Sequence, residues 1–431
     1  MIASVGRMMR KGGGGLSWPA GMKEHIKAWY DPKKQGMTNF DVIEAYTEDF
    51  TTWTVNKEGV IANVTSKSIT ITNVLNSNPL IYAYGTFSVR LRIDGLKNGQ
   101  GIFFGDNKEY TISENGIYDI DTTENIRTNF IGECNITITQ LPTSILKDFS
   151  GNGNHAYLYG GKGKLNSGMG LYKVDFTSWR KSSVQTEVKP DVVKVTPNTS
   201  DYLFIQYANS VEIPSYKIKV IGLGDNVLKY QYATENGRKE INIVEGENEL
   251  PTSIKVSNDY QIGYRLTPGT SVFTITQIPD YPDQLCYDGK MYAVCYGFPI
   301  LTDYTVMAER TWFENRNVFL AKGNITTEAK YAFIFERFKP DGVMTVQSFG
   351  AWNDVVSTTD SCISYLTKNK YNGIDIRSGI GADDDMLSIG GALNKGNIEL
   401  TSVCCHGAII VADRSFTEEE INWLKDNLFR K

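Results

Sequence analysis

Three consecutive carboxylates, Asp383, Asp384 and Asp385, form the densest acidic run of the chain. Loops rich in carboxylate oxygens can bind Ca²⁺. The spacing is not that of an EF-hand, and Gly379 and Gly381 nearby fit equally a solvated loop between two strands. Ca²⁺ is therefore the one cofactor that the sequence leaves open. We expect no other cofactor and no dedicated metal site.

Tryptophan is the second residue type that could hold a ligand, because its ring can stack on the flat face of a sugar. Trp53 and Trp179 each follow an Asp-Phe-Thr sequence in the same register, which favours a place in the core. Trp352 has no such counterpart, and the sequence leaves a core position and an exposed platform equally open. We take Trp352 and the acidic run 383–385 as the candidate ligand-binding residues.

Known catalytic motifs are missing from the chain. It has no G-x-S-x-G nucleophile elbow, no phosphate-binding P-loop and no H-E-x-x-H zinc motif. The three histidines, His25, His155 and His406, lie far apart in the sequence and indicate no general base. A glycosidase needs two carboxylates that face each other across a sugar, but 49 Asp and Glu residues make candidate pairs too numerous to be informative. We therefore expect that the chain is not an enzyme.

The N-terminal segment 1–21 combines basic residues with a glycine run. Its charges follow the short apolar start, which is the wrong order for a signal peptide and predicts synthesis in a cytoplasm. Glycine allows close approach to another backbone, and basic side chains can pair with carboxylates of a partner. We expect an anchor to a partner, made by Arg7, Arg10, Lys11, Gly12, Gly13, Gly14 and Gly15.

The overall composition predicts a folded, mostly β protein. The chain has 431 residues, enough for several cores, and its 24 Tyr, 19 Phe and 40 Gly favour strands joined by tight turns. The net charge of −5 argues against nucleic acid as a partner. No apolar run approaches the length of about 20 residues that a membrane span needs.

An internal repeat divides the chain. Four segments of residues 47–142 recur in the same order in residues 173–280. A single match between two strands can arise by chance, but four matches in one order indicate a repeat. Alternating apolar and polar residues predict strands with one buried face, so each copy is expected to be a small β-sandwich. The matches join 49–53 (DFTTW) to 175–179 (DFTSW), 88–96 (SVRLRIDGL) to 215–223 (SYKIKVIGL), 108–112 (KEYTI) to 239–243 (KEINI), and 136–142 (ITITQLP) to 273–279 (FTITQIP).

Segments 22–46, 143–172 and 281–431 surround the two copies. The last of them has strand patterns of its own and ends in one clear helix signal. Thr417 and Glu420 form a capping box, and Phe416 and Ile421 form a hydrophobic staple. This short amphipathic helix is expected to pack on the domain that the surrounding segments build.

Three motifs of the surrounding segments resemble a LamG-like jelly roll of the concanavalin A-like lectin superfamily. They are 148–156 (DFSGNGNHA), 287–289 (YDG) with 301–306 (LTDYTV), and 416–421 (FTEEEI). They follow the family's order but are separated by the two repeats. The expected fold is therefore all-β, a discontinuous lectin-like jelly-roll sandwich into which two mutually homologous sandwich modules are inserted, with a short C-terminal helix.

Residues 28–39 (AWYDPKKQGMTN) resemble the opening of LamG-containing structural proteins of bacteriophages. This resemblance implies a protein of the virion surface, a head fibre or capsid decoration protein that displays modules able to bind bacterial or mucosal glycans. Its implied partners are other virion proteins, bound through the N-terminal tail, and further copies in a homotrimer. The alternatives are a tail fibre that recognises a bacterial glycan and, less favoured, a polysaccharide depolymerase.

Overall fold

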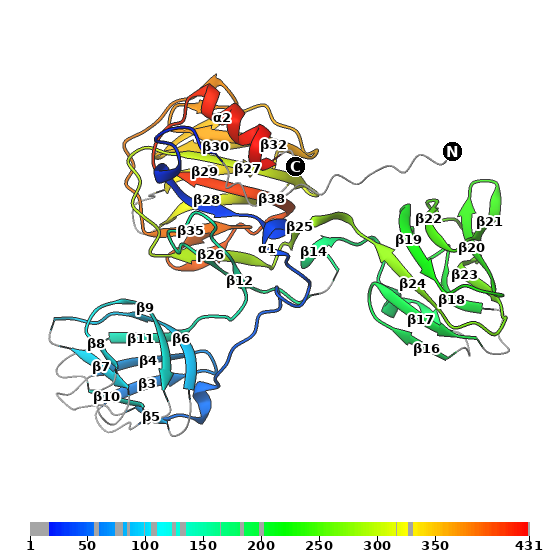
Figure 1. The fold of residues 1–431 in the computed structure, drawn as a ribbon, viewed down its shortest axis with the longest axis horizontal. Coiled ribbons are helices and arrows are strands. Elements are labelled where there is room, and N and C mark those ends of the chain that lie inside the picture. Colours follow the sequence, from blue (N-terminus) through cyan, green and yellow to red (C-terminus); the bar gives the residue numbers. More distant parts are fainter. Residues whose placement is uncertain are drawn as a thin grey trace, which may run out of the picture.

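The computed structural model is built almost entirely of antiparallel strands, arranged as one large sandwich that carries two small ones (Figure 1). It describes residues 17–55, 60–73, 81–83, 87–98, 100–104, 110–122, 126–129, 135–163, 165–181, 185–197, 202–315, 317–325 and 331–429. The basic residues and glycines predicted as an anchor lie outside the described residues. None of the helices in the described part is long and apolar enough to cross a membrane.

The first sheet of the large sandwich has eight strands, drawn from three separate stretches of the chain. Its path runs β14-β25-β38-β27-β32-β33-β34, and β1 pairs with β38 beside this path. The first and last parts of the protein therefore lie side by side in one sheet. The bounds are β1 Ile26–Tyr30, β14 Gly168–Leu171, β25 Asp280–Asp288, β27 Thr305–Trp312, β32 Cys362–Thr367, β33 Lys370–Tyr371, β34 Ile374–Asp375 and β38 Val403–Ala412.

The second sheet has ten strands and faces the first across the main core. Its path runs β12-β13-β26-β35-β28-β29-β30-β31, with β36 and β37 attached to β28. Val306 and Ile409 of the first sheet and Phe333 and Val346 of the second share one buried cluster. The bounds are β12 Ile145–Leu146, β13 Ala156–Tyr159, β26 Tyr292–Tyr296, β28 Asn317–Ile325, β29 Tyr331–Phe338, β30 Met344–Ser348, β31 Ala351–Asp354, β35 Met386–Ile389, β36 Ala392–Asn394 and β37 Asn397–Glu399.

Each inserted module is a sandwich of two five-stranded sheets, and the two modules have the same strand order. The sheets are β2-β5-β10-β7-β8 and β3-β4-β11-β6-β9 in the first, and β15-β18-β23-β20-β21 and β16-β17-β24-β19-β22 in the second. Numbering the strands from the start of each module makes the two descriptions identical. The expected all-β fold, a discontinuous jelly roll with two homologous insertions, is confirmed.

The module strands have the following bounds. In the first module they are β2 Thr54–Val55, β3 Val60–Val64, β4 Ser68–Asn73, β5 Ile81–Ala83, β6 Phe87–Asp94, β7 Gly101–Phe104, β8 Tyr110–Ile112, β9 Gly116–Thr122, β10 Ile126–Asn129 and β11 Asn135–Gln140. In the second they are β15 Arg180–Lys181, β16 Gln185–Val188, β17 Val192–Thr196, β18 Tyr202–Tyr207, β19 Tyr216–Ile221, β20 Val227–Thr234, β21 Gly237–Ile243, β22 Gly246–Leu250, β23 Gln261–Thr267 and β24 Phe273–Ile278.

The repeated motifs occupy equivalent places in the two modules. The one-turn helices η2 (Phe50–Thr52) and η3 (Phe176–Ser178) are both followed by a buried tryptophan, Trp53 and Trp179. These two rings are core residues, as the shared register predicts. Both modules therefore use the same local sequence to start the same fold.

The C-terminal helix covers the outer face of the eight-stranded sheet. It comprises α2 (Glu418–Leu424) and a final turn η4 (Lys425–Phe429), and the predicted capping box of Thr417 and Glu420 is present. Ile421 and Leu424 are buried in one cluster with Met307 and Ile410 of the sheet. The two other short helices of the described chain are η1 (Lys23–His25) and α1 (Pro32–Gln35).

Candidate functional site

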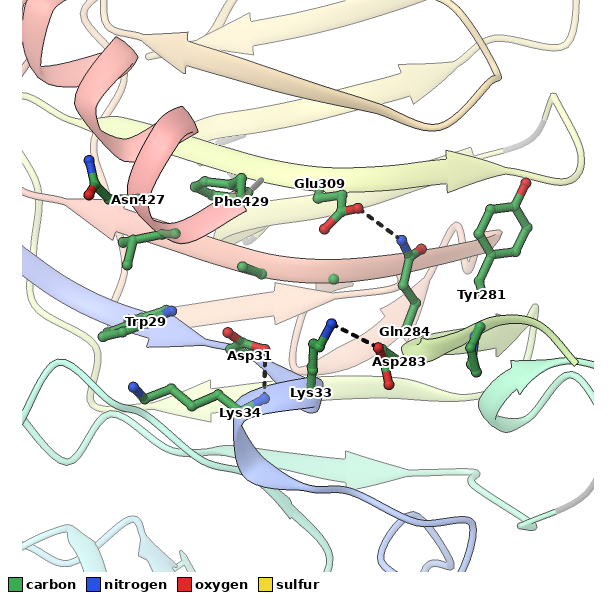
Figure 2. A pocket seen from close by; sticks show the side chains of 14 residues that line it. Trp29, Asp31, Lys33, Lys34, Tyr281, Asp283, Gln284, Glu309, Asn427 and Phe429 are labelled. Atoms are coloured by element: carbon green, nitrogen blue, oxygen red, sulfur yellow. Dashed lines mark hydrogen bonds and ion pairs between the residues drawn. The ribbon is translucent and has the colours of Figure 1, made fainter. Parts of the chain in front are cut away.

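A groove of about 580 Å³ opens on the outer face of the eight-stranded sheet, beside the C-terminal helix (Figure 2). Along one edge of β38 the pairing strand changes from β25 to β1, and the groove lies at this change. Leu285 of β25 pairs with His406, whereas Tyr30 of β1 pairs with Ile409. The two strands diverge between these points. The groove is lined there by Trp29, Asp31, Lys33, Lys34, Tyr281, Pro282, Asp283, Gln284, Glu309, Gly407, Ala408, Asn427, Leu428 and Phe429.

A β-bulge in β38 lies opposite Glu309 of β27, whose regular strand alternation turns its side chain to the outer face of the sheet. Ala308 pairs with Ile409 and Arg310 with His406, so that Glu309 alone faces two residues of β38. The extra residue of this bulge belongs to β38, whereas Glu309 keeps its regular pairing with Ile363 of β32. One of the two residues of β38 is Gly407, where an added Cβ would lie 2.3 Å from Oε2 of Glu309. Glycine at this position therefore makes room for the carboxylate.

Gln284 of β25 holds the Glu309 side chain from across β38, which lies between their strands. Its Nε2 donates to Oε1 of Glu309 at 3.2 Å, and Figure 2 shows the two side chains pointing toward each other. Burial raises the pKa of Glu309, and the nearby carboxylate of Asp31 raises it further. The protonated form of Glu309 is therefore favoured more than in an exposed glutamate.

Helix α1 supplies the charged residues on the other side of the groove. Asp31 caps this helix by accepting from the backbone N–H of Lys34 at 2.9 Å. Nζ of Lys33 lies 3.0 Å from Oδ2 of Asp283, an exposed ion pair that raises the pKa of Lys33. Exposed pairs of this kind contribute little to stability.

Aromatic rings form the ends of the groove. Trp29 and Phe429 are nearly buried and Tyr281 is partly exposed. The Nζ of Lys34 lies 4.3 Å from the centre of the Trp29 ring. Trp29 Nε1 is buried and has no hydrogen-bond partner among the described residues. A buried donor of this kind is normally satisfied, so a ligand that accepts a hydrogen bond here would be favoured.

The groove thus combines apolar ring edges with hydrogen-bonding groups of both polarities. Gln284 and Asn427 carry amides, Asp31 and Glu309 carry carboxyl groups, and Lys33 donates. A sugar has the matching character, because its hydroxyl groups both donate and accept while its C–H faces are apolar. Ligand sites in general combine an apolar lining with a few placed polar groups.

The structure does not bring the candidates predicted from the sequence together. Asp383 is buried in the large sandwich, where its carboxylate lies 3.0 Å from Nζ of Lys322 and accepts from the backbone N–H of Leu301. These contacts make Asp383 a structural residue. Burial and the neighbouring Asp385 raise the pKa of Asp384 to about 6. Within the described residues, no three His, Cys, Asp or Glu side chains converge on a possible metal position.

Trp352 lies in the ten-stranded sheet, on edge strand β31, and its side chain is 37% exposed. It takes no part in the groove around Glu309. The motif at 148–156 has a structural task as well, since Asp148 accepts from the backbone N–H groups of Trp29, Ser150 and Asn154. The turn thereby attaches to β1.

The residues of the groove were not predicted from the sequence. Asp31 and Lys33 fall in the segment 28–39, whose resemblance to phage proteins implies no role for either side chain. Glu309 stands at an outward position of its strand, where a charge is ordinary. No local signal marks it as part of a site, since Glu309, Gly407 and Gln284 meet only through long-range pairing.

Comparison with known proteins does not assign a family. No family model and no curated protein matches the chain. Among solved structures, a Trypanosoma rangeli sialidase in complex with the inhibitor DANA is similar over 85% of this chain and 83% of its own, with 9% identity and a TM-score of 0.24. The same sialidase in complex with 2,3-difluorosialic acid covers 91% and 90%, with 8% identity and a TM-score of 0.25.

A tandem of CBM22 domains from Paenibacillus barcinonensis Xyn10C is also similar, over 57% of this chain and 96% of its own, with 9% identity and a TM-score of 0.18. The expectation that the chain is not an enzyme is corrected by these comparisons, because they lead to sialidases, which are enzymes. TM-scores this low carry no argument for a particular activity. We therefore withdraw the expectation and assign no sialidase function.

Proposed function

We propose that this protein binds glycans and is displayed on the surface of a bacteriophage particle, with the groove around Glu309 as the glycan-binding site. The supporting observation is the setting of the Glu309 carboxyl group. It stands on the outer face of the sheet, over Gly407 of the bulge in β38, which leaves room for it, and beside the Gln284 amide that orients it.

The proposed location on a virion rests on the resemblance of residues 28–39 to the opening of LamG-containing structural proteins of bacteriophages. Two modules inserted into one sandwich agree with a display role, since several copies per particle would raise avidity without new contacts. Mass spectrometry of purified virions tests this location. Particles that lack the chain would contradict it, and imaging of labelled particles separates a head fibre from a tail fibre.

Glycan binding is tested with the purified full-length chain on an array of bacterial surface glycans, followed by titration of the best ligand. We expect Glu309→Ala and Gln284→Ala to weaken binding at least about tenfold, which is the effect of losing a hydrogen bond to a charged group. Glu187→Ala is the matched control, because Glu187 is 78% exposed in the second module. Equal affinity of all three variants and the native chain would contradict the proposal.

Polysaccharide cleavage is a second candidate function, favoured by the raised pKa of Glu309. A carboxyl group whose pKa is raised holds its proton more firmly and can act as a general acid. The second carboxyl group a glycosidase requires is available in Asp31, whose charge acts on Glu309. Incubation of the bound polysaccharide with the protein and measurement of new reducing ends decides between binding alone and cleavage.

A further inference from the structure

A second groove, also of about 580 Å³, lies on the other sheet of the jelly roll. It is lined by Arg337, Lys339, Pro340, Asp341 and Trp352. These residues belong to the end of β29, to the turn that follows it and to edge strand β31. No residue of this groove belongs to the groove around Glu309.

The register of the strands places an aromatic ring and two polar side chains on one face. Trp352 pairs with Gln347, and Arg337 pairs with Thr345 two residues further along β30. Directly opposed residues point to the same face of a sheet. The guanidinium carbon of Arg337 lies 5.2 Å from the centre of the Trp352 ring, so the cation holds the ring in place.

Two hydrogen-bonding atoms on this face are buried without partners in the described part of the chain. They are Nε of Arg337 and Oε1 of Gln347, and the Gln347 side chain as a whole is buried. Buried polar atoms in native proteins nearly always have a partner, so each exception requires an explanation. A polar ligand on Trp352 would supply one, with small side-chain adjustments.

Arg337 is the group beside Trp352 that can bind an anion. Asp354 is paired with Lys339, whose Nζ lies 2.7 Å away, and Asp341 accepts from the backbone N–H of Val343 and thereby caps the turn. Each nearby carboxylate therefore has a partner other than Arg337. Arg337 has no carboxylate partner among the described residues. Its guanidinium can still form the two parallel hydrogen bonds that a carboxylate accepts.

We propose that this groove is a second carbohydrate site, selective for a sugar that carries a carboxylate, such as a uronic acid residue of a polysaccharide. The sugar ring contacts Trp352, and the carboxylate is bound by Arg337. The site is independent of Glu309. A chain that binds glycans at both places would hold one long acidic polysaccharide or two separate strands.

The test uses the full-length protein and two matched probes, an oligosaccharide of glucuronic acid and the same oligosaccharide with its carboxyl groups reduced to alcohols. We expect the native protein to prefer the acidic probe by about tenfold or more, because charge-assisted hydrogen bonds are the strong ones. Arg337→Gln should abolish this preference. Trp352→Ala should weaken binding of both probes, whereas Phe40→Ala, a control at a ring that is 82% exposed, should change neither.

A ¹⁹F NMR measurement on the otherwise native protein tests the site even where a variant unfolds. Fluorotryptophan labelling gives one ¹⁹F resonance for Trp352, identified by its loss in Trp352→Phe, and the acidic probe should shift it. An unshifted resonance at saturating probe, or an unchanged preference in folded Arg337→Gln, would overturn the proposal. If Glu309→Ala removes all binding of the acidic probe and Trp352→Ala removes none, this second site is refuted and the groove around Glu309 stands.

Discussion

Nη2 of Arg310 donates to Oε1 of Glu336 at 2.9 Å, and neither side chain is exposed to solvent. Arg310 belongs to β27 in the first sheet and Glu336 to β29 in the second, so the ion pair joins the two layers of the jelly roll. A register shift in β29 turns Glu336 inward, and its φ of +60° is a conformation that non-glycine residues rarely adopt. Trp312 and Tyr371 also donate to its carboxylate.

Replacing Glu336 by glutamine should destabilise the jelly roll by about 3–5 kcal/mol, because the buried guanidinium of Arg310 would lose its countercharge. Urea unfolding followed by near-ultraviolet circular dichroism measures the change. The double variant Arg310→Met with Glu336→Leu should lose less free energy of unfolding than either of these substitutions alone. Each single variant leaves one buried charge unpaired. Equal losses in the single and the double variants would show that packing, and not charge, determines the effect.

Glu309 should make the stability of the protein depend on pH. Its pKa is raised in the folded state by burial and by Asp31, so folding favours the protonated form. This contribution is present below the pKa of the unfolded chain and is lost as pH rises through the higher pKa of the folded state. Glu309→Gln removes the titration. Its Tm relative to the native chain should therefore increase as pH rises above the ordinary pKa of a glutamate, as measured by calorimetry. A constant difference would contradict this assignment.

Gly407→Ala should weaken glycan binding by displacing the Glu309 carboxylate. The new Cβ would stand 2.3 Å from Oε2, and the flexible glutamate must move away. Stability should change little, because the end of a side chain moves and not the backbone. Combining Gly407→Ala with Glu309→Asp, which shortens the side chain, should restore part of the affinity in a binding titration. Native affinity in Gly407→Ala alone would show that the position of the carboxylate is unimportant.

Gln277→Leu should open the start of the second module. The buried amide of Gln277 accepts from the backbone N–H groups of Lys173 and Val174 at 2.7 Å and 3.1 Å and donates to the carbonyl of Val174 at 2.9 Å. Unsatisfied buried groups cost about 1–3 kcal/mol each. Hydrogen exchange at the amides of Lys173 and Val174 should therefore accelerate.

Gln140→Leu is the matched variant in the first module. Gln140 accepts from the N–H groups of Thr47 and Glu48 and donates to the carbonyl of Glu48, as its counterpart does in the second module. Its effect on exchange should be confined to these amides. Accelerated exchange in both modules from either variant would mean that the modules open together and do not fold as separate units.

Patterns in the sequence determined the fold class and the repeated architecture. Strand alternation, the duplicated motifs and the capping box at Thr417 depend on neighbours only a few residues away, and their physical consequences are therefore local. The burial of Trp53 and Trp179 followed from the same reasoning, because both occupy one register in two copies of a module.

Tertiary structure alone decided which polar residues form sites. The acidic run could not be interpreted without knowing that Lys322, about sixty residues earlier in the chain, meets Asp383 inside the sandwich. The groove around Glu309 combines residues near 30, 281, 309, 407 and 429. Strand alternation turns Glu309 outward, but only the pairing with β38 places Gly407 beneath its carboxyl group. The extra residue of the bulge in β38 sets this pairing, and no local pattern specifies where such a residue occurs.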